Sequence, residues 1–265
     1  VWTMKKWVSL ALVTAMSLSA AFAVAEESSS LKDFTGRLKN SAVQEQTAQP
    51  EPATQSEDDN SFGQPVKIDD PFFEKVRSSA FVREDKYSKE ANVMIEVKNV
   101  SGRTLYPRSA TVSALNAAGE VVEEETYSNC APDMVENGDS MFVWDWFYGF
   151  DTPIEEIASF AVTVETETSS YTEYQKIDAQ GVVMDGIVYA LVENTLDTDI
   201  YGIDAVAVMD DADGNLLDIS EIGTGNAVGV FPGSTMILRA NARDYANDTS
   251  LNEGNATVYA LHELD

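Results

Sequence analysis

The stretch Val93-Met94-Ile95-Glu96-Val97-Lys98-Asn99 alternates branched apolar residues with residues of other kinds. An alternation with period two puts Val93, Ile95 and Val97 on one side of an extended chain, as in a half-buried β-strand. The same period returns in residues 160–165, where Phe160 opens a second alternating run. The stretch therefore predicts β-structure, and the runs around it decide what kind.

Short turn signals separate these runs. Clusters of Asn, Asp and Gly favour tight reversals of the chain because these residues adopt the backbone angles that turns require. They occur at residues 99–102, 116–119, 136–139, 211–215 and 232–233. Many short strands with glycine-containing turns and no long helical period are typical of an antiparallel sandwich. One helical turn is expected near residues 153–159.

The opening stretch has a counterpart 95 residues further along the chain. At that shift the sequence aligns with itself without a gap, which is the mark of a repeated structural unit. The coinciding residues are Val97, Asn99, Tyr106, Ala110, Gly119, Gly138, Met141 and Ala161, which meet Val192, Asn194, Tyr201, Ala205, Gly214, Gly233, Met236 and Ala256. We predict an all-β chain with two tandem immunoglobulin-like antiparallel β-sandwich domains, repeat 1 in residues 70–168 and repeat 2 in residues 169–265.

The N-terminal part has a different composition. Met4-Lys5-Lys6 precedes an apolar run over residues 7–24, so residues 1–25 are expected to form a secretory signal peptide cleaved after Ala25. An uncleaved anchor helix is the alternative. Residues 26–69 are rich in Ser, Gln, Glu, Pro and Thr and are expected to form a disordered linker. We expect a secreted or cell-envelope protein without a membrane span after cleavage.

Composition excludes several classes of function. The formal net charge of -28 argues against nucleic-acid binding, which requires a basic face. Cys130 and His262 are the single residues of their kinds, so neither an internal disulfide nor a common zinc site can form. A catalytic triad would depend on His262, close to the chain end, and we therefore expect no enzyme.

An acidic turn in repeat 2 resembles part of a calcium loop. Asp211, Asp213 and Asn215 place oxygen ligands at alternate positions, which suits a hard cation. The equivalent turn in repeat 1, residues 116–119, has almost no such ligands. We therefore favour a hairpin turn without a cofactor, and keep a calcium-dependent envelope assembly protein as an alternative.

The repeat also singles out one aromatic strand. In repeat 2 the residues in register with Met236 should face the core, and the shift transfers this register to repeat 1. Met141, Val143, Asp145 and Phe147 are then expected to point inward. The candidate binding residues Phe142, Trp144, Trp146 and Tyr148 are expected to point outward. Such a row is either an open interaction patch or a face covered by the second repeat, by Phe72-Phe73 or by residues 154–160.

The motifs of repeat 2 resemble a known family. Val192-Glu193-Asn194-Thr195, Asp213-Gly214-Asn215-Leu216-Leu217 and Phe231-Pro232-Gly233-Ser234 follow one another as in bacterial extracytoplasmic FxLYD-type domains. The motif that names the family is replaced by Ser113-Ala114-Leu115-Asn116 in one repeat and Val208-Met209-Asp210-Asp211 in the other. The resemblance implies an immunoglobulin-like sandwich without enzymatic activity, and transfers no site residues.

These observations predict a non-enzymatic secreted or cell-envelope-associated protein that serves as a binding module or as a spacer. Its partner would be an extracellular protein or a glycan. The alternative within this class is a carbohydrate-binding module that uses the aromatic strand of repeat 1, because flat aromatic rows stack against sugar rings.

Overall fold

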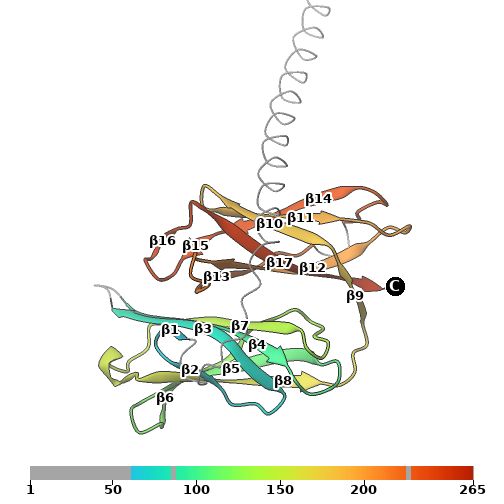
Figure 1. Cartoon of the computed structure of the whole chain (residues 1–265). Coiled ribbons are helices and arrows are strands. Elements are labelled where there is room, and N and C mark those ends of the chain that lie inside the picture. Colours follow the sequence, from blue (N-terminus) through green and yellow to red (C-terminus); the bar gives the residue numbers. More distant parts are fainter. Residues whose placement is uncertain (1–60, 85–87, 225–227, 265) are drawn as a thin grey trace, which may run out of the picture. The chain divides into compact units, whose positions relative to one another are not determined.

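The computed structural model describes residues 61–84, 88–224 and 228–264, apart from the side chain of Asn255. These residues belong to one compact unit, residues 53–265. They form strands arranged as sandwich-like sheets, with one short 3-10 turn at η2 (Ile154–Glu156) where a helical turn was expected (Figure 1). The all-β prediction is confirmed. The expected signal peptide and residues 26–60 of the expected linker lie outside the described residues.

The first group of strands contains the alternating stretch Val93–Asn99. Its elements are β1 (Ser61–Gly63), β2 (Val66–Ile68), β3 (Phe73–Glu84), β4 (Lys89–Asn99), β5 (Tyr106–Leu115), β6 (Val121–Ala131), β7 (Ser140–Tyr148) and β8 (Ser159–Glu167). They are hydrogen-bonded in the order β1-β3-β4-β7-β6-β5-β8-β2. Strand β6 pairs with β5 and then, through residues 129–131, with β7, so it joins the two layers. Val93, Ile95 and Val97 are fully buried in the core between those layers.

The second group follows residue 172. Its elements are β9 (Glu173–Ile177), β10 (Ala179–Met184), β11 (Ile187–Glu193), β12 (Tyr201–Asp210), β13 (Leu216–Glu221), β14 (Thr235–Asn241), β15 (Arg243–Asp244), β16 (Thr249–Ser250) and β17 (Glu253–Leu264). The main sheet runs β13-β12-β17-β10-β11-β14, with β9 also paired to β17. Its own core includes Val188, Ile203 and Met209. No described strand of one group pairs with a strand of the other. Because one compact unit contains both groups, the division into two domains stays a prediction.

The expected boundary of the linker is wrong at its C-terminal end. Residues 61–63 and 66–68, assigned to the disordered linker, form β1 and β2. Strand β1 runs parallel to β3 and β2 runs parallel to β8, so both cover sheet edges. Val66 is buried in the first core. Ile68 packs against the same core and Phe62 contacts the ring of Phe81, so apolar contacts as well as backbone pairing hold a segment that we expected to be disordered.

Hydrogen bonds recur at the 95-residue shift. The side-chain amide of Asn99 donates to the carbonyl oxygens of Arg103 and Val135 at 2.8 and 2.9 Å. The amide of Asn194 donates to the carbonyls that lie 4 and 36 residues further along, at 2.8 and 2.7 Å. Both asparagines are fully buried. An asparagine at the equivalent position thus makes the same two hydrogen bonds in each group of strands.

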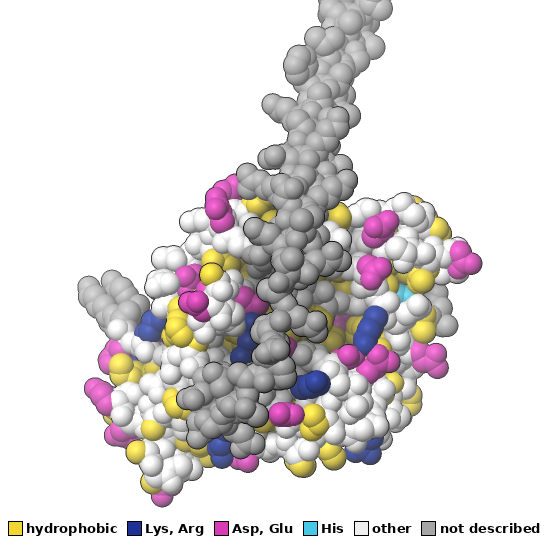
Figure 2. Space-filling view, viewed as in Figure 1, with side chains coloured by type: hydrophobic (Ala, Val, Ile, Leu, Met, Phe, Trp, Pro, Cys, Tyr) yellow, Lys and Arg dark blue, Asp and Glu magenta, His cyan; other side chains and the backbone are white. Residues whose placement is uncertain are grey.

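A third apolar cluster contains residues from both groups. Met94, Ala131 and Phe142 are buried together with side chains of β12 and β13, namely Val206, Val208, Leu216 and Ile219. Strand β4 was expected to be half-buried, with Met94 on its polar side, but Met94 is only 1% exposed. The outer face of β4 and β7 is therefore covered around Met94 and Phe142. Acidic side chains are scattered over the face shown in Figure 2 rather than gathered in one patch.

Candidate binding groove

Strand β7 carries the aromatic row that the sequence singled out. Met141, Val143 and Phe147 lie in the first core, which confirms the inward register for these three. Asp145 is half-buried and is not part of that core. Its Oδ1 atom accepts a hydrogen bond from the backbone N–H of Trp146 at 2.6 Å. The carboxylate is thus satisfied locally, without a partner in the apolar interior.

Exposure rises steadily along the other side of β7. Phe142 is fully buried, with its ring centroid 4.9 Å from that of Tyr259. Trp144 is half-buried against the third cluster, whereas Trp146 is 38% exposed and Tyr148 is 73% exposed. Phe142 points away from the first core as expected, and it is covered by the second group of strands, which was one of the two alternatives for this row. Apolar residues of β12 and β13 cover that end of the row, and only its far end remains open to a ligand.

The open end of the row borders a groove of about 610 Å³. One wall comes from β4, β6 and β7, and the other comes from β13, β14, β15 and the residues next to them. The lining residues are Asn92, Met94, Asn129, Trp144, Asp145, Trp146, Asp218, Ile219, Ser220, Asn241, Arg243 and Tyr245. The volume lies within the range of small-molecule sites. The lining combines aromatic rings with amides and carboxylates.

An arginine lies beside two of these rings, which contact each other edge to face with their centroids 5.9 Å apart. The guanidinium carbon of Arg243 lies 5.2 Å from the ring centroid of Trp146 and 5.3 Å from that of Tyr245. Arg243 also forms an ion pair with Asp248. The Trp146 Nε1–H donates to Glu90 Oε2 at 3.2 Å. A cation of the same protein therefore already contacts part of this aromatic pair, while Trp146 keeps 38% of its surface exposed.

Two buried polar residues complete the groove. Asn92 is directly opposite Trp146 in the β4–β7 pair, is 7% exposed, and has an Oδ1 atom without a hydrogen-bond partner. Asp218 is 4% exposed and accepts the backbone N–H of Arg243 at 2.8 Å. Desolvation by burial raises the pKa of Asp218 to about 7, against the opposing effect of that hydrogen bond. Sequence reasoning missed Asn92, Asp218, Arg243 and Tyr245, because nothing in the sequence brings these distant positions together.

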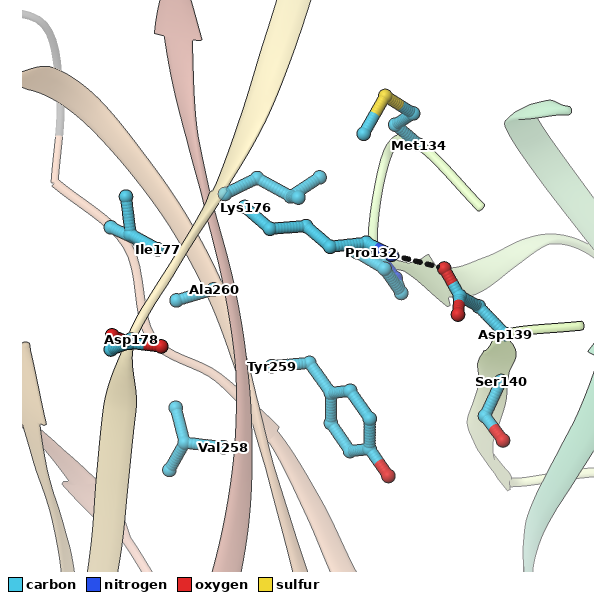
Figure 3. Close-up of a pocket in the computed structure, with 11 residues that line it drawn as sticks. Pro132, Met134, Asp139, Ser140, Lys176, Ile177, Asp178, Val258, Tyr259 and Ala260 are labelled. Carbon is cyan, nitrogen blue, oxygen red and sulfur yellow. Dashed lines mark hydrogen bonds and ion pairs between the residues drawn. The ribbon is translucent and has the colours of Figure 1, made fainter. Parts of the chain in front are cut away.

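A second, smaller pocket is more apolar. It measures about 310 Å³ and is lined by Met134, Ile177, Val258 and Tyr259, among others. Lys176 at its edge forms ion pairs with Glu136 and Asp139, and Figure 3 shows the contact with Asp139. The aromatic groove is the better candidate site, because it is larger and contains Trp144 and Trp146 of the row that the sequence singled out.

The acidic turn at residues 211–215 is a hairpin turn. Asp211 Oδ1 accepts the backbone N–H groups of Asp213 and Asn215, both at 2.9 Å, and Oδ2 accepts the Asn215 amide at 2.8 Å. Asn116 Oδ1 accepts the backbone N–H groups two and four residues further on in the same way, at 2.9 and 3.0 Å. Within the described ranges no group of three or more His, Cys, Asp or Glu could hold a metal ion.

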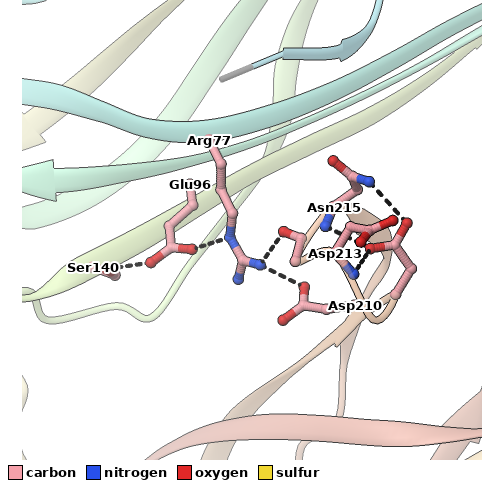
Figure 4. A network of polar contacts seen from close by, with 8 residues as sticks. Arg77, Glu96, Ser140, Asp210, Asp213 and Asn215 are labelled. Carbon is pink, nitrogen blue, oxygen red and sulfur yellow. Dashed lines mark hydrogen bonds and ion pairs between the residues drawn. The ribbon is translucent and has the colours of Figure 1, made fainter. Parts of the chain in front are cut away.

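Arg77 connects this turn to the first group of strands (Figure 4). Its Nε atom lies 2.6 Å from Glu96 Oε2, and its Nη1 atom lies 2.8 Å from Asp210 Oδ1 and donates to the Gly214 carbonyl. Ser140 donates to the other oxygen of Glu96 at 2.6 Å. Glu96 is buried, so the network pairs a charge that would otherwise be costly to desolvate.

The single histidine and the single cysteine are both buried or half-buried in strands. His262 is buried in β17, with Nδ1 2.9 Å from the carbonyl oxygen of Glu263. Cys130 is half-buried against the first core. Burial, with smaller contributions from Asp133 and Glu221, raises its pKa to about 11 and keeps the thiol protonated at neutral pH.

Comparison with known proteins identifies no family. No family model matches the chain. No curated protein matches it either. Among solved structures, red sea bream transglutaminase is 13% identical over 71% of this chain, with a TM-score of 0.18. The chain spans 29% of that protein's length, and a similarity this weak carries no argument. No helix in the described part of the chain is long and apolar enough to cross a membrane.

Proposed function

We propose that this protein is a non-enzymatic binding protein that acts outside the cytoplasm, and that the aromatic groove is its ligand-contact surface. The observation that carries the proposal is the groove itself. The exposed end of the β7 row meets a buried Asn92 Oδ1 that lacks a partner. Convergent aromatic and polar side chains in a hollow are the usual features of a binding site.

Two further features support the proposal. Met4-Lys5-Lys6 and the apolar run after it have the pattern of a secretion signal, and an acidic composition suits a protein exposed to solvent. The matching hydrogen bonds of Asn99 and Asn194 favour two copies of one module, and the sequence motifs of repeat 2 resemble the FxLYD type. On this proposal the copies share a scaffold, and the aromatic strand distinguishes the first copy from the second.

A capture experiment with the secreted protein tests the proposal. The protein is immobilised and exposed to solubilised cell-envelope material, and the captured fraction is compared between wild type and the double variant Trp146→Ala/Tyr148→Ala. We expect the variant to lose the captured material and to keep its melting temperature, because both side chains are at least one-third exposed. Tyr171→Ala, at an exposed tyrosine outside the groove, is the matched control. Equal capture by wild type and the double variant would refute the proposal.

A further inference from the structure

We infer that the ligand of the groove is an uncharged saccharide, held by ring stacking at Trp146 and by a hydroxyl group that donates to Asn92 Oδ1. The inference rests on the proposed function and names its ligand class. It is carried by three properties of the groove: an accessible ring surface, an unsatisfied neutral acceptor, and charged groups that already have partners within the protein.

The ring surface lies at the exposed end of β7. Trp146 and Tyr148 meet edge to face, with ring centroids 5.8 Å apart, and both are accessible. A pyranose presents C–H groups on its faces and hydroxyl groups around its rim. Such a ring can bury its apolar face against an aromatic side chain while its rim stays available for hydrogen bonds.

The acceptor is Asn92. Its buried amide oxygen has no hydrogen-bond partner, which is unfavourable, and a ligand hydroxyl group would supply one. Asn92 is opposite Trp146 on the neighbouring strand, so one ligand can contact both residues. The amides of Asn129 and Asn241 also line the groove, and each offers donors and an acceptor. Hydroxyl groups match such amides because they both donate and accept.

The charges of the groove argue against an ionic ligand. A cationic ligand group at Trp146 and Tyr245 would be repelled by the guanidinium of Arg243, which already lies beside both rings. The groove carboxylates already accept backbone N–H groups, Asp145 from Trp146 and Asp218 from Arg243. An anionic ligand would meet these two carboxylates and Glu90 on a protein of formal net charge -28. A neutral, hydroxyl-rich ligand avoids both conflicts.

Calorimetric titration of the full secreted protein tests the inference. The probes are neutral hexasaccharides of glucose and of N-acetylglucosamine, with oligogalacturonate and hexalysine as the anionic and cationic comparisons. We expect at least one neutral hexasaccharide to bind. We expect Asn92→Leu, which removes the acceptor and keeps the site filled, to weaken that binding at least tenfold without lowering the melting temperature. Trp146→Ala should abolish binding, and Tyr171→Ala should leave it unchanged.

Three outcomes would overturn the inference. They are binding of hexalysine or oligogalacturonate alone, equal saccharide affinity in Asn92→Leu and wild type, and no binding of any probe. Failure here is distinguishable from failure of the proposed function. If no saccharide binds while capture of envelope material still depends on Trp146 and Tyr148, the ligand class alone is wrong. If capture is also independent of these residues, both proposals fail.

Discussion

At the scale of single residues, Arg77 shows how one cation can connect distant parts of a chain. Its guanidinium bridges Glu96 on the neighbouring strand and Asp210 at the end of β12. Desolvation lowers the pKa of Arg77, but attraction to Asp210 and Glu96 outweighs it, so the pKa is raised overall and the side chain stays charged. Removing the cation leaves two carboxylates close together in a poorly hydrated place.

Arg77→Ala is expected to lower the free energy of unfolding by about 2–3 kcal/mol, because buried Glu96 loses its charged partner. Chemical denaturation monitored by circular dichroism measures this difference. Arg108→Ala, which removes an exposed ion pair with Glu167, is the matched control and should cause no measurable change. Similar losses of unfolding free energy in the two variants would show that the Arg77 network stabilises the fold no more than an exposed ion pair does.

Asp218 predicts a particular dependence of stability on pH. Its folded pKa of about 7 lies above the ordinary value of 3.8, so between these values the native state holds a proton that the unfolded state releases. Stability should therefore fall as pH rises from about 4 to 7, by about 1.4 kcal/mol for each unit of difference. Asp204, with its pKa raised to about 6 by burial, adds to the same trend.

The variant Asp218→Asn tests this behaviour. Asn stays neutral and can still accept the Arg243 N–H, so its gain in melting temperature over wild type should be small near pH 4 and largest above pH 7. Glu155→Gln, at an exposed position, controls for the loss of one negative charge. A gain in melting temperature that is the same at pH 4 and pH 8 would contradict the raised pKa of Asp218.

At the scale of elements, alternation predicted the strands well because the apolar period reflects burial directly. It correctly placed Val93, Ile95 and Val97 inside, and transferring the register by 95 residues correctly placed Met141 and Val143. It missed residues 61–68, where the alternating run Val66-Lys67-Ile68 is too short to stand out from the polar segment around it and is stabilised by pairing to a sheet edge.

The groove could be predicted only in part. Trp144 and Trp146 carry a sequence signal because four aromatics alternate on one strand. Asn92, Asp218 and Arg243 carry none, since each looks like an ordinary polar residue until the fold brings β4, β13 and β15 together. The burial of Phe142 has the same origin, because the residues that cover its side chain come from β12 and β13.

Strands β10 and β17 approach each other closely at Gly181. A Cβ atom on Gly181 in β10 would lie 2.5 Å from the carbonyl oxygen of Ala256 in β17. Gly181→Ala should therefore push these paired strands apart and cost about 1–3 kcal/mol of stability. Gly254→Ala is the control on the same strand pair, since its Cβ would meet nothing nearer than 3.8 Å. Thermal denaturation of both variants measures the difference, and equal melting temperatures would contradict the close approach.

At the scale of the whole molecule, the third apolar cluster links the two groups of strands. Phe142→Ala should lower the free energy of unfolding by about 3–5 kcal/mol, since it empties the centre of this cluster. Scanning calorimetry should show one transition for wild type and a broadened or split transition for the variant. Tyr148→Ala, on the same strand but 73% exposed, should keep the wild-type profile. If Phe142→Ala also kept that profile, the cluster would not couple the two groups.

The graded exposure of β7 gives the two ends of this strand different tolerances to sequence change. At Phe142 a smaller or polar side chain weakens the packing between the strand groups, so variation there is restricted by folding. At Tyr148, six residues away and in the same hydrogen-bonded pair, the side chain meets mainly solvent and variation leaves the fold intact. On the proposed function, ligand preference can therefore diverge at one end of the strand while folding restricts the sequence at the other.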